Sequence, residues 1–404
     1  MMLFHLGALM LGIVGDSPQP TATPVLNKGI TVYAERVYTR PGEMIENGAV
    51  HIENGKIRAI TPGVKPPKGD DVMRAAAMTA GMVDASIRIN TGVTSVEQSK
   101  EVGAHRSHSD SIDIFDFRWA RQARSGVTTV LANPNDANVI GGMGLVLKTA
   151  GEETLEARMV KSDAVVRGCI GTEPSRGNRT AFGPPTDFYV RRPTTRMGVE
   201  GELRKAFWDA AQGVKFDGHE ELLRVLKGEL PLCIQAATTQ DIRTAIFLEE
   251  EMKKEGFGDI RLIVDACAEA WMEPDFLVRT GTAAVLPPFD HDGRTPIDGA
   301  FMAWNVAKLL QDKGVMIALS SHGAVSAADR LGLQASYAMR GGLTFDEALA
   351  AVTSNPAEIL GVQKRVGSIA TGMDGDVVLW SGTPFEPSSR IVGVLIDGEP
   401  VDAR

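Results

Sequence analysis

The chain has 404 residues, of which 43% are hydrophobic and 23% are charged, and its formal net charge is -9. This is the composition of an ordinary globular protein, and the length can hold one barrel of roughly 250 residues plus a smaller domain. The negative charge argues against nucleic acid or an anionic membrane surface as a partner, because both favour a basic face. Cys169, Cys233 and Cys267 stand in or beside apolar runs without Cys-x-x-Cys spacing, so we expect buried free thiols.

The first 15 residues are apolar apart from His5, and a spacer rich in Pro and Thr follows over 16–24. A run this short cannot span a bilayer, so we interpret residues 1–27 as a signal peptide and linker. The protein would then be exported, to the periplasm or outside the cell. The alternatives are a wrongly assigned start or a disordered tail on a cytoplasmic protein. No later segment is apolar enough to be transmembrane.

Both ends of the chain carry short, alternating β patterns, over residues 28–75 and 362–404. The pairs Asn47-Gly48 and Asn54-Gly55 predict hairpin turns between β-rich runs. Two β segments that bracket a long α/β middle most simply form one small domain, so we expect a β-sandwich built from both chain ends.

Between residues 76 and 361, short apolar runs alternate with amphipathic helices, which is typical of repeated βα units around a parallel sheet. The predicted fold class is α/β, a distorted TIM (β/α)8 barrel. In the opening strand near 78–90, Asp84, Ser86 and Arg88 should share one face, because strand side chains alternate. The other expected strands cover 128–132, 144–148, 165–170, 232–236, 261–265, 283–286 and 315–320, with an amphipathic helix over 241–254.

Nearly the whole chain resembles the amidohydrolase superfamily, and in particular its imidazolonepropionase-related branch. Gly81, Val83, Asp84 and Ala85 match a superfamily segment that ends in Asp-Ala-His-x-His. Further similar stretches are 120–130, 133–144, 195–198, 241–245, 347–361 and 367–376. The resemblance implies the barrel, the composite β domain and the hydrolysis of C–N bonds at a metal centre.

The metal ligands of that superfamily lie at the ends of barrel strands. They are two His on the first strand, often a carboxylated Lys or a Glu, single His residues on the fifth and sixth, and an Asp on the eighth. The matching positions here are Ser86, Arg88, Gln235, Ala266 and His322, or Ser321 in place of His322 if the register slips by one. Lys148 ends an apolar strand, so it is either the former carboxylated lysine or a lysine paired with an acid.

Two hypotheses follow from these substitutions. In the first, the protein is a metal-free pseudoenzyme without a cofactor, which binds a small molecule or supports a partner enzyme at the barrel mouth. Arg88 would then replace the metal as the positive centre, with Asp265 as its expected partner. In the second, an active hydrolase of cyclic amides or related compounds binds one divalent metal such as zinc, with ligands drawn from His105, His108, Asp290, His291, Asp292 and His322.

Several of these residues also have a simpler interpretation. The segment with His105 and His108 is a solvated polar loop or a lid that contacts the ligand, and residues 290–292 are a polar loop after the seventh strand. Asn138 stands in a glycine-rich stretch that either presents backbone N–H groups to an anion or only permits a tight return. Barrel proteins of this superfamily commonly associate, so we expect either a homo-oligomer or a hetero-oligomer with an active amidohydrolase.

Overall fold

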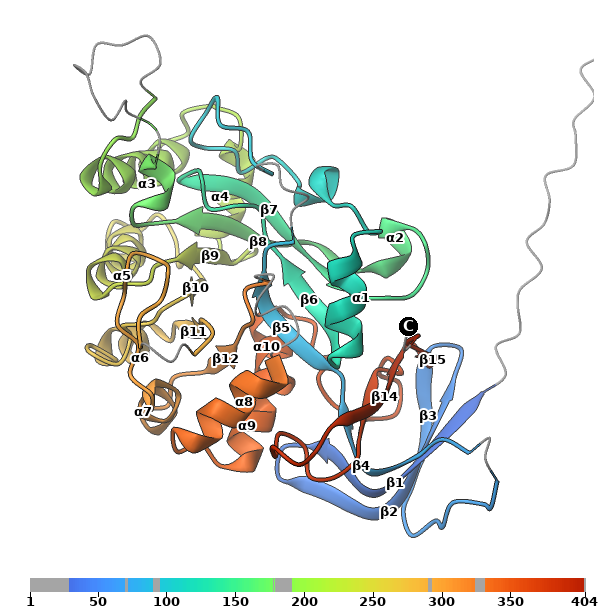
Figure 1. Ribbon diagram of the computed structural model, residues 1–404. Coiled ribbons are helices and arrows are strands. Elements are labelled where there is room, and N and C mark those ends of the chain that lie inside the picture. The colour runs from blue at the N-terminus through green and yellow to red at the C-terminus, as the bar shows by residue number, and fades with distance from the viewer. Residues whose placement is uncertain are drawn as a thin grey trace, which may run out of the picture.

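The computed structural model describes residues 29–69, 72–89, 95–176, 178, 191–289, 293–323 and 331–402. The expected leader over residues 1–27 and the candidate site residues Asp290, His291 and Asp292 lie outside the described residues. In the ranges described, no helix combines the length and the apolar character that crossing a bilayer requires. Two sheets organise the chain, a larger one flanked by helices and a smaller one at its end (Figure 1).

The smaller sheet is built from both ends of the chain, as the sequence predicts. Its strand order is β15-β14-β13-β4-β1-β2-β3, so an N-terminal strand lies directly beside a C-terminal one. Val50, Met78 and Val377 come from distant parts of the sequence and pack into one buried core. The strands are β1 (Ile30–Arg40), β2 (Glu43–Glu53), β3 (Lys56–Thr61), β4 (Arg74–Ala80), β13 (Val377–Trp380), β14 (Ile391–Ile396) and β15 (Glu399–Pro400).

One of the two predicted hairpin turns is present. Asn54 and Gly55 connect β2 to β3 with φ angles of 51° and 74°, the left-handed region that such a turn needs. The prediction for Asn47-Gly48 is wrong, because this pair lies inside β2 and continues to pair with β1. Gly48 is needed there for close approach, since a Cβ at this position would lie 2.8 Å from Cγ2 of Val37.

The larger sheet is the nearly closed barrel that the fold prediction requires. Its eight strands follow one another in sequence order from β5 to β12, and a parallel bridge between Ile87 and His322 brings the first and last together. The distortion lies in β7, which is antiparallel to both of its neighbours. The strands are β5 (Met82–Ile87), β6 (Val127–Ala132), β7 (Ile140–Lys148), β8 (Met159–Cys169), β9 (Leu232–Gln235), β10 (Leu262–Asp265), β11 (Ala283–Leu286) and β12 (Ile317–Leu319).

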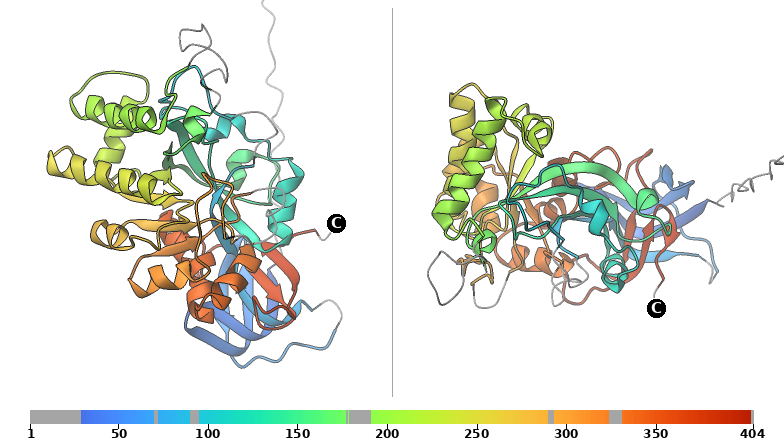
Figure 2. Two further views of the ribbon diagram at one scale, coloured as in Figure 1. Left: turned by 60° about the vertical axis from the view of Figure 1, so that its left-hand side comes forward. Right: turned by 90° about the horizontal axis from the view of Figure 1, so that it is seen from above.

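Helices cover the outside of the barrel, and those from residue 196 to 254 stand on the side away from the small sheet (Figure 2). In α5 (Thr239–Lys254) the apolar residues Ile242, Ile246 and Met252 are buried, which confirms the predicted stripe. The remaining helical elements are α1 (Phe117–Arg124), α2 (Leu155–Arg158), α3 (Arg196–Ala211), α4 (His219–Leu226), α6 (Asp275–Thr280), α7 (Val306–Asp312), α8 (Leu331–Arg340), α9 (Phe345–Val352), α10 (Ser354–Ile359) and the short 3-10 turns η1 (His108–Ser111) and η2 (Glu173–Ser175).

The chain crosses from one sheet to the other at Gly81. Its N–H donates to the carbonyl of Asp376 at 2.9 Å, on the side of the small sheet. A side chain at this position would overlap Thr128 of β6. Glycine is therefore required by the close approach of Thr128, and the first barrel strand begins immediately after it.

Candidate functional site

A layer of polar side chains lies at the carboxyl ends of the barrel strands, one step beyond an apolar layer. Side chains two residues apart on a strand face the same side, so each polar residue shares its face with an apolar residue that precedes it. The apolar members belong to one buried cluster, and the polar members are themselves buried. The pairs are Leu131 and Asn133, Val165 and Arg167, Cys233 and Gln235, Ile263 and Asp265, and Ala318 and Ser320.

Asp265 is the centre of this layer. Its Oδ2 accepts from Nη1 of Arg167 at 2.7 Å and from Oγ of Ser86 at 2.8 Å. Its Oδ1 accepts from the N–H of Ala266 at 2.8 Å and lies 3.0 Å from Nε2 of His322. Burial opposes ionisation of this carboxyl, but Arg167 and His322 outweigh it and hold the pKa of Asp265 below its usual range. With four partners, Asp265 is a saturated carboxylate.

Arg167 links Asp265 to a second carboxylate. Its Nε donates to Oδ1 of Asp136 at 2.7 Å, and its side chain is only 1% exposed. Asp136 in turn forms an ion pair with Nη1 of Arg88 through its Oδ2. The series Arg88, Asp136, Arg167, Asp265, His322 is here named the charge ladder. Its two arginines and two aspartates alternate, so these four charges compensate one another.

The partner expected for Arg88 is wrong. Arg88 does lie on the inner face with Ser86, but it pairs with Asp136 rather than Asp265. Asp265 is taken by Arg167, which reaches it from β8. Sequence reasoning singled out neither Arg167 nor Asp136, although a lone arginine inside the apolar run over 165–170 was a usable signal.

Asp84 closes the barrel between its first and last strands. Its Oδ1 accepts from Oγ of Ser320 at 2.7 Å, and its Oδ2 accepts from both the N–H and the Oγ of Ser321, at 2.9 and 2.6 Å. No cation pairs with this carboxylate among the described residues. Burial raises the pKa of Asp84, and the serine hydrogen bonds oppose the rise.

A sequence model of the amidohydrolase family matches residues 302–401. An amidohydrolase from Thermotoga maritima has a solved structure that is 29% identical, with a TM-score of 0.78 over 93% of this chain and 100% of that one. The chain carries an amidohydrolase family domain and is similar to an amidohydrolase over most of its length. The amidohydrolase tasK of Hapsidospora irregularis is 28% identical over 310 residues, and the match spans 68% of this chain but 30% of that protein. A β-aspartyl dipeptidase from Fervidobacterium islandicum shares the fold at 16% identity and a TM-score of 0.54, over 93% of this chain and 97% of that one.

Within this barrel, several of the predicted site positions come together. Ser86, Arg88 and His322 belong to the polar layer, together with Asp265. Gln235 lies beside them, fully buried, with Nε2 3.3 Å from Sγ of Cys169. Ala266 contributes its backbone N–H rather than a side chain, at a positive φ of 58°.

Lys148 does not belong to the barrel mouth. It ends β7, and because β7 is antiparallel its carboxyl end lies at the opposite end of the barrel, facing the small sheet. There its Nζ forms ion pairs with Asp374 at 2.9 Å, with Asp376 and with Asp397 at 3.4 Å. Lys148 is therefore the paired lysine of the two alternatives, and it joins the two parts of the fold.

The loop residues His108 and Asn138 have structural partners, whereas Nδ1 of His105 is buried without a hydrogen-bond partner among the described residues. Nδ1 of His108 lies 2.9 Å from Oγ of Ser111, and burial lowers the pKa of His108 to about 4. Asn138 donates from Nδ2 to the carbonyls of residues 97 and 100 and accepts from Arg191 at 2.9 Å. Across the described residues, no three His, Cys, Asp or Glu side chains gather in a way that could hold a metal ion.

The three cysteines are buried and free, as predicted. Burial raises the pKa of the Cys233 thiol to about 12, so it is not a ready nucleophile.

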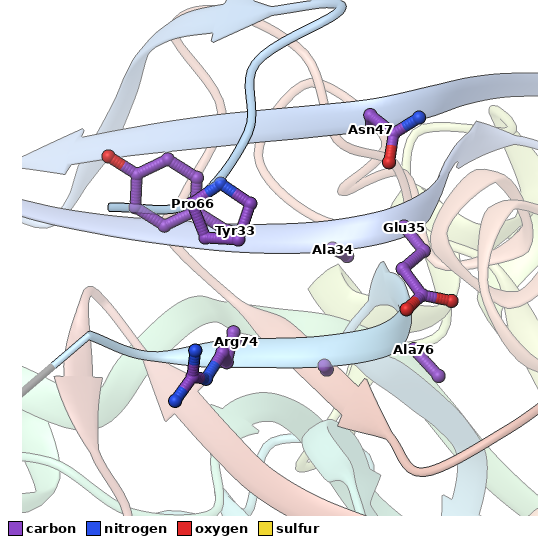
Figure 3. A pocket seen from close by; sticks show the side chains of 8 residues that line it. Tyr33, Ala34, Glu35, Asn47, Pro66, Arg74 and Ala76 are labelled. Atoms are coloured by element: carbon purple, nitrogen blue, oxygen red, sulfur yellow. The ribbon is translucent and has the colours of Figure 1, made fainter. Parts of the chain in front are cut away.

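A cavity of about 280 Å³ lies in the small sheet (Figure 3). No residue of the charge ladder lines it; its walls are Tyr33, Ala34, Glu35, Asn47, Pro66, Arg74, Ala75 and Ala76.

Proposed function

We propose that this chain is a metal-free member of the imidazolonepropionase-related branch, a pseudoenzyme that binds a small molecule at the barrel mouth. The observation that carries the proposal is the charge ladder, because it fills the region where the superfamily pattern expects metal ligands. Its two guanidinium groups supply the positive charge there, and its carboxylates are engaged with them.

The donor set does not fit a divalent metal. The superfamily pattern has His at the positions that hold Ser86, Arg88, Gln235 and Ala266 in this chain, and it has Asp at the position of His322. In the superfamily pattern, the carboxylated residue lies between the first and fifth strands. In this chain, Arg167 on β8 lies in that interval, faces the inside of the barrel and contacts Asp265. An ion on Asp265 would have to displace this arginine. The buried guanidinium would then keep only Asp136 of its two carboxylate partners, and it shares Asp136 with Arg88.

The same residues cannot activate a water molecule as a bound metal ion does. Arginine remains protonated in proteins and cannot act as a general base. It offers no coordination position at which a water could be ionised. Recognition of a small molecule needs neither property, and the buried, mutually paired side chains keep such a site rigid.

Metal analysis of the purified full chain tests the proposal, before and after incubation with zinc, manganese or iron followed by desalting. We expect far less than one metal ion per chain in both samples. Near-stoichiometric metal, removable by a chelator together with hydrolysis of a cyclic amide, would overturn the pseudoenzyme and decide for an active hydrolase.

The hydrolase remains a second candidate because of one contact. The pair of His322 and Asp265, 3.0 Å apart, has the geometry of an imidazole oriented by a carboxylate, as general bases often have. Among the other metal ligands proposed for the hydrolase, His105 and His108 have surroundings separate from those of His322. Residues 290–292 lie outside the described ranges.

Partnership and location are also proposals. In association with an active relative, a metal-free barrel would have a supporting role. The expected export signal would place this protein and its partner outside the cytoplasm. Sizing the protein alone and mixed with a catalytic relative from the same source tests the first. A strict monomer that never associates would count against it.

A further inference from the structure

We infer that the cavity in the small sheet is a binding site for a free amino acid, whose carboxylate contacts Arg74 and whose ammonium group contacts Glu35. This site lies outside the barrel, so the inference goes beyond the proposed function and does not depend on it. It starts from two opposite charges that line one cavity without pairing with each other (Figure 3).

Strand register brings the two charges to the same cavity. Arg74 on β4 lies beside Tyr33 on β1, and Glu35 follows two residues further along β1. Neighbouring strands are about 4.8 Å apart and rise about 3.3 Å per residue, so the backbones of Arg74 and Glu35 are roughly 8 Å apart. Val32, next to Tyr33 in the chain, belongs to the buried core, so the cavity opens on the side of the sheet away from that core.

Both charged side chains are free to bind a ligand. Glu35 and Arg74 are exposed, and neither forms an ion pair or a side-chain hydrogen bond with another described residue. In Figure 3 their charged groups extend toward opposite ends of the cavity. Glu35 would repel a simple anion bound to Arg74, and Arg74 would repel a simple cation bound to Glu35. A zwitterion compensates both charges at once, and a free amino acid is the commonest small molecule of that kind.

The cavity is already formed by backbone contacts. The N–H of Val64 donates to the carbonyl of Asn47 at 2.7 Å, and the N–H of Tyr33 donates to the carbonyl of Met73 at 3.0 Å. These two bonds hold both ends of the connection that carries Pro66, which is part of the cavity wall. The volume of about 280 Å³ lies just below the range of about 300–1,000 Å³ for pockets that bind drug-sized ligands, so it suits a molecule as small as an amino acid.

The uncharged part of the wall favours an aromatic amino acid. Ala34, Ala75 and Ala76 leave space, and the ring of Tyr33 offers a surface on which another aromatic ring can pack. Asn47 has a φ of 51°, a left-handed conformation that is uncommon for a residue inside a strand. Such conformations concentrate at binding sites.

Titration calorimetry on the full chain tests the inference with L-phenylalanine and two analogues that each keep one charge. N-acetyl-L-phenylalanine keeps the carboxylate, and L-phenylalanine methyl ester keeps the ammonium group at about pH 6. We expect saturable binding of L-phenylalanine. Each analogue should bind about fivefold more weakly, the upper end for the loss of one charge contact that is open to solvent.

Two variants assign the charges. Arg74→Gln should weaken L-phenylalanine about fivefold and remove its advantage over the methyl ester, because the carboxylate has lost its partner. Glu35→Gln should instead remove its advantage over N-acetyl-L-phenylalanine. Both positions are exposed, so neither substitution should disturb the fold.

Two further variants are controls. Glu46→Gln removes an exposed charge next to Asn47 that does not line the cavity, and it should change nothing. Arg88→Gln, in the charge ladder, should leave the affinity for L-phenylalanine as it is in the parent. Absence of saturable L-phenylalanine binding, equal binding of either analogue, or weaker binding in Arg88→Gln would overturn the inference; the last result would place the ligand at the barrel mouth.

Discussion

Arg167 donates to Asp265 at 2.7 Å across the centre of the barrel, with both side chains out of contact with solvent. Their strands are separated in the sheet by β9, so the pair ties together two strands that do not hydrogen-bond each other. In a low-dielectric interior, neither charge is tolerated without the other. The pair therefore sets both the stability of the barrel core and the charge available at its mouth.

Removing the guanidinium alone should be severe. We expect Arg167→Met to lower the free energy of unfolding by about 3–5 kcal/mol, since it leaves Asp265 and Asp136 without their shared cation. Denaturant unfolding measures this loss. Arg167→Met combined with Asp265→Asn should recover part of it, and Arg204→Met, in an exposed ion pair, should cost about 0–1 kcal/mol. Equal losses for Arg167→Met and Arg204→Met would show that the ladder is not buried in solution.

Arg88 should matter less for stability than for binding. Its partner Asp136 keeps the hydrogen bond from Arg167 when Arg88 is removed. We expect Arg88→Ala to cost about 1.5–3 kcal/mol, the range for a hydrogen bond to a charged group, in the same unfolding experiment. A variant as stable as the parent would mean that the guanidinium points into solvent, and the idea of a fixed cation at the mouth would fail.

His108 should make the fold sensitive to mild acid. Burial lowers its pKa to about 4, below the value of about 6.5 expected in the unfolded chain, so the unfolded state binds a proton more readily. The neutral side chain stabilises the fold fully above pH 6.5, and this contribution of about 3 kcal/mol is lost as the pH falls toward 4. Unfolding free energies at pH 7 and pH 5 should differ less in His108→Gln than in the parent. If His108→Gln and the control His51→Gln follow the same pH profile as the parent, the explanation is wrong.

Lys148 should hold the small sheet against the barrel. Its loss would leave Asp374 and Asp376 buried with fewer cations, although Asp374 keeps Lys56 and Arg365. We expect Lys148→Met to destabilise the protein by about 3–5 kcal/mol and to speed amide hydrogen exchange around Gly81, where the sheets meet. Lys205→Met, at an exposed helix pair, is the control. Exchange that accelerates elsewhere but not at this junction would contradict the assigned role.

Much of this molecule follows from local pattern. Alternation along each strand predicts both the existence of the strands and the inward face of Ser86 and Arg88, because side-chain direction on a strand has a period of two. The β patterns at the two chain ends predict their joint sheet, and the apolar stripe predicts α5. Parallel strands present their carboxyl ends at one side of a barrel, so Ser86, Asp265 and His322 were expected at the same end of the barrel.

Strand direction and the choice of partners were decided only by the tertiary structure. The sequence pattern of the run that ends in Lys148 is the same for a parallel and for an antiparallel strand. Because the strand is antiparallel, this lysine lies at the far end of the barrel. Likewise, the sequence predicted Arg88 as the partner of Asp265 and did not single out Arg167. The register between strands brings Arg167 to Asp265 and places Asp136 between Arg88 and Arg167, because pairing depends on distances between segments that are far apart in the chain.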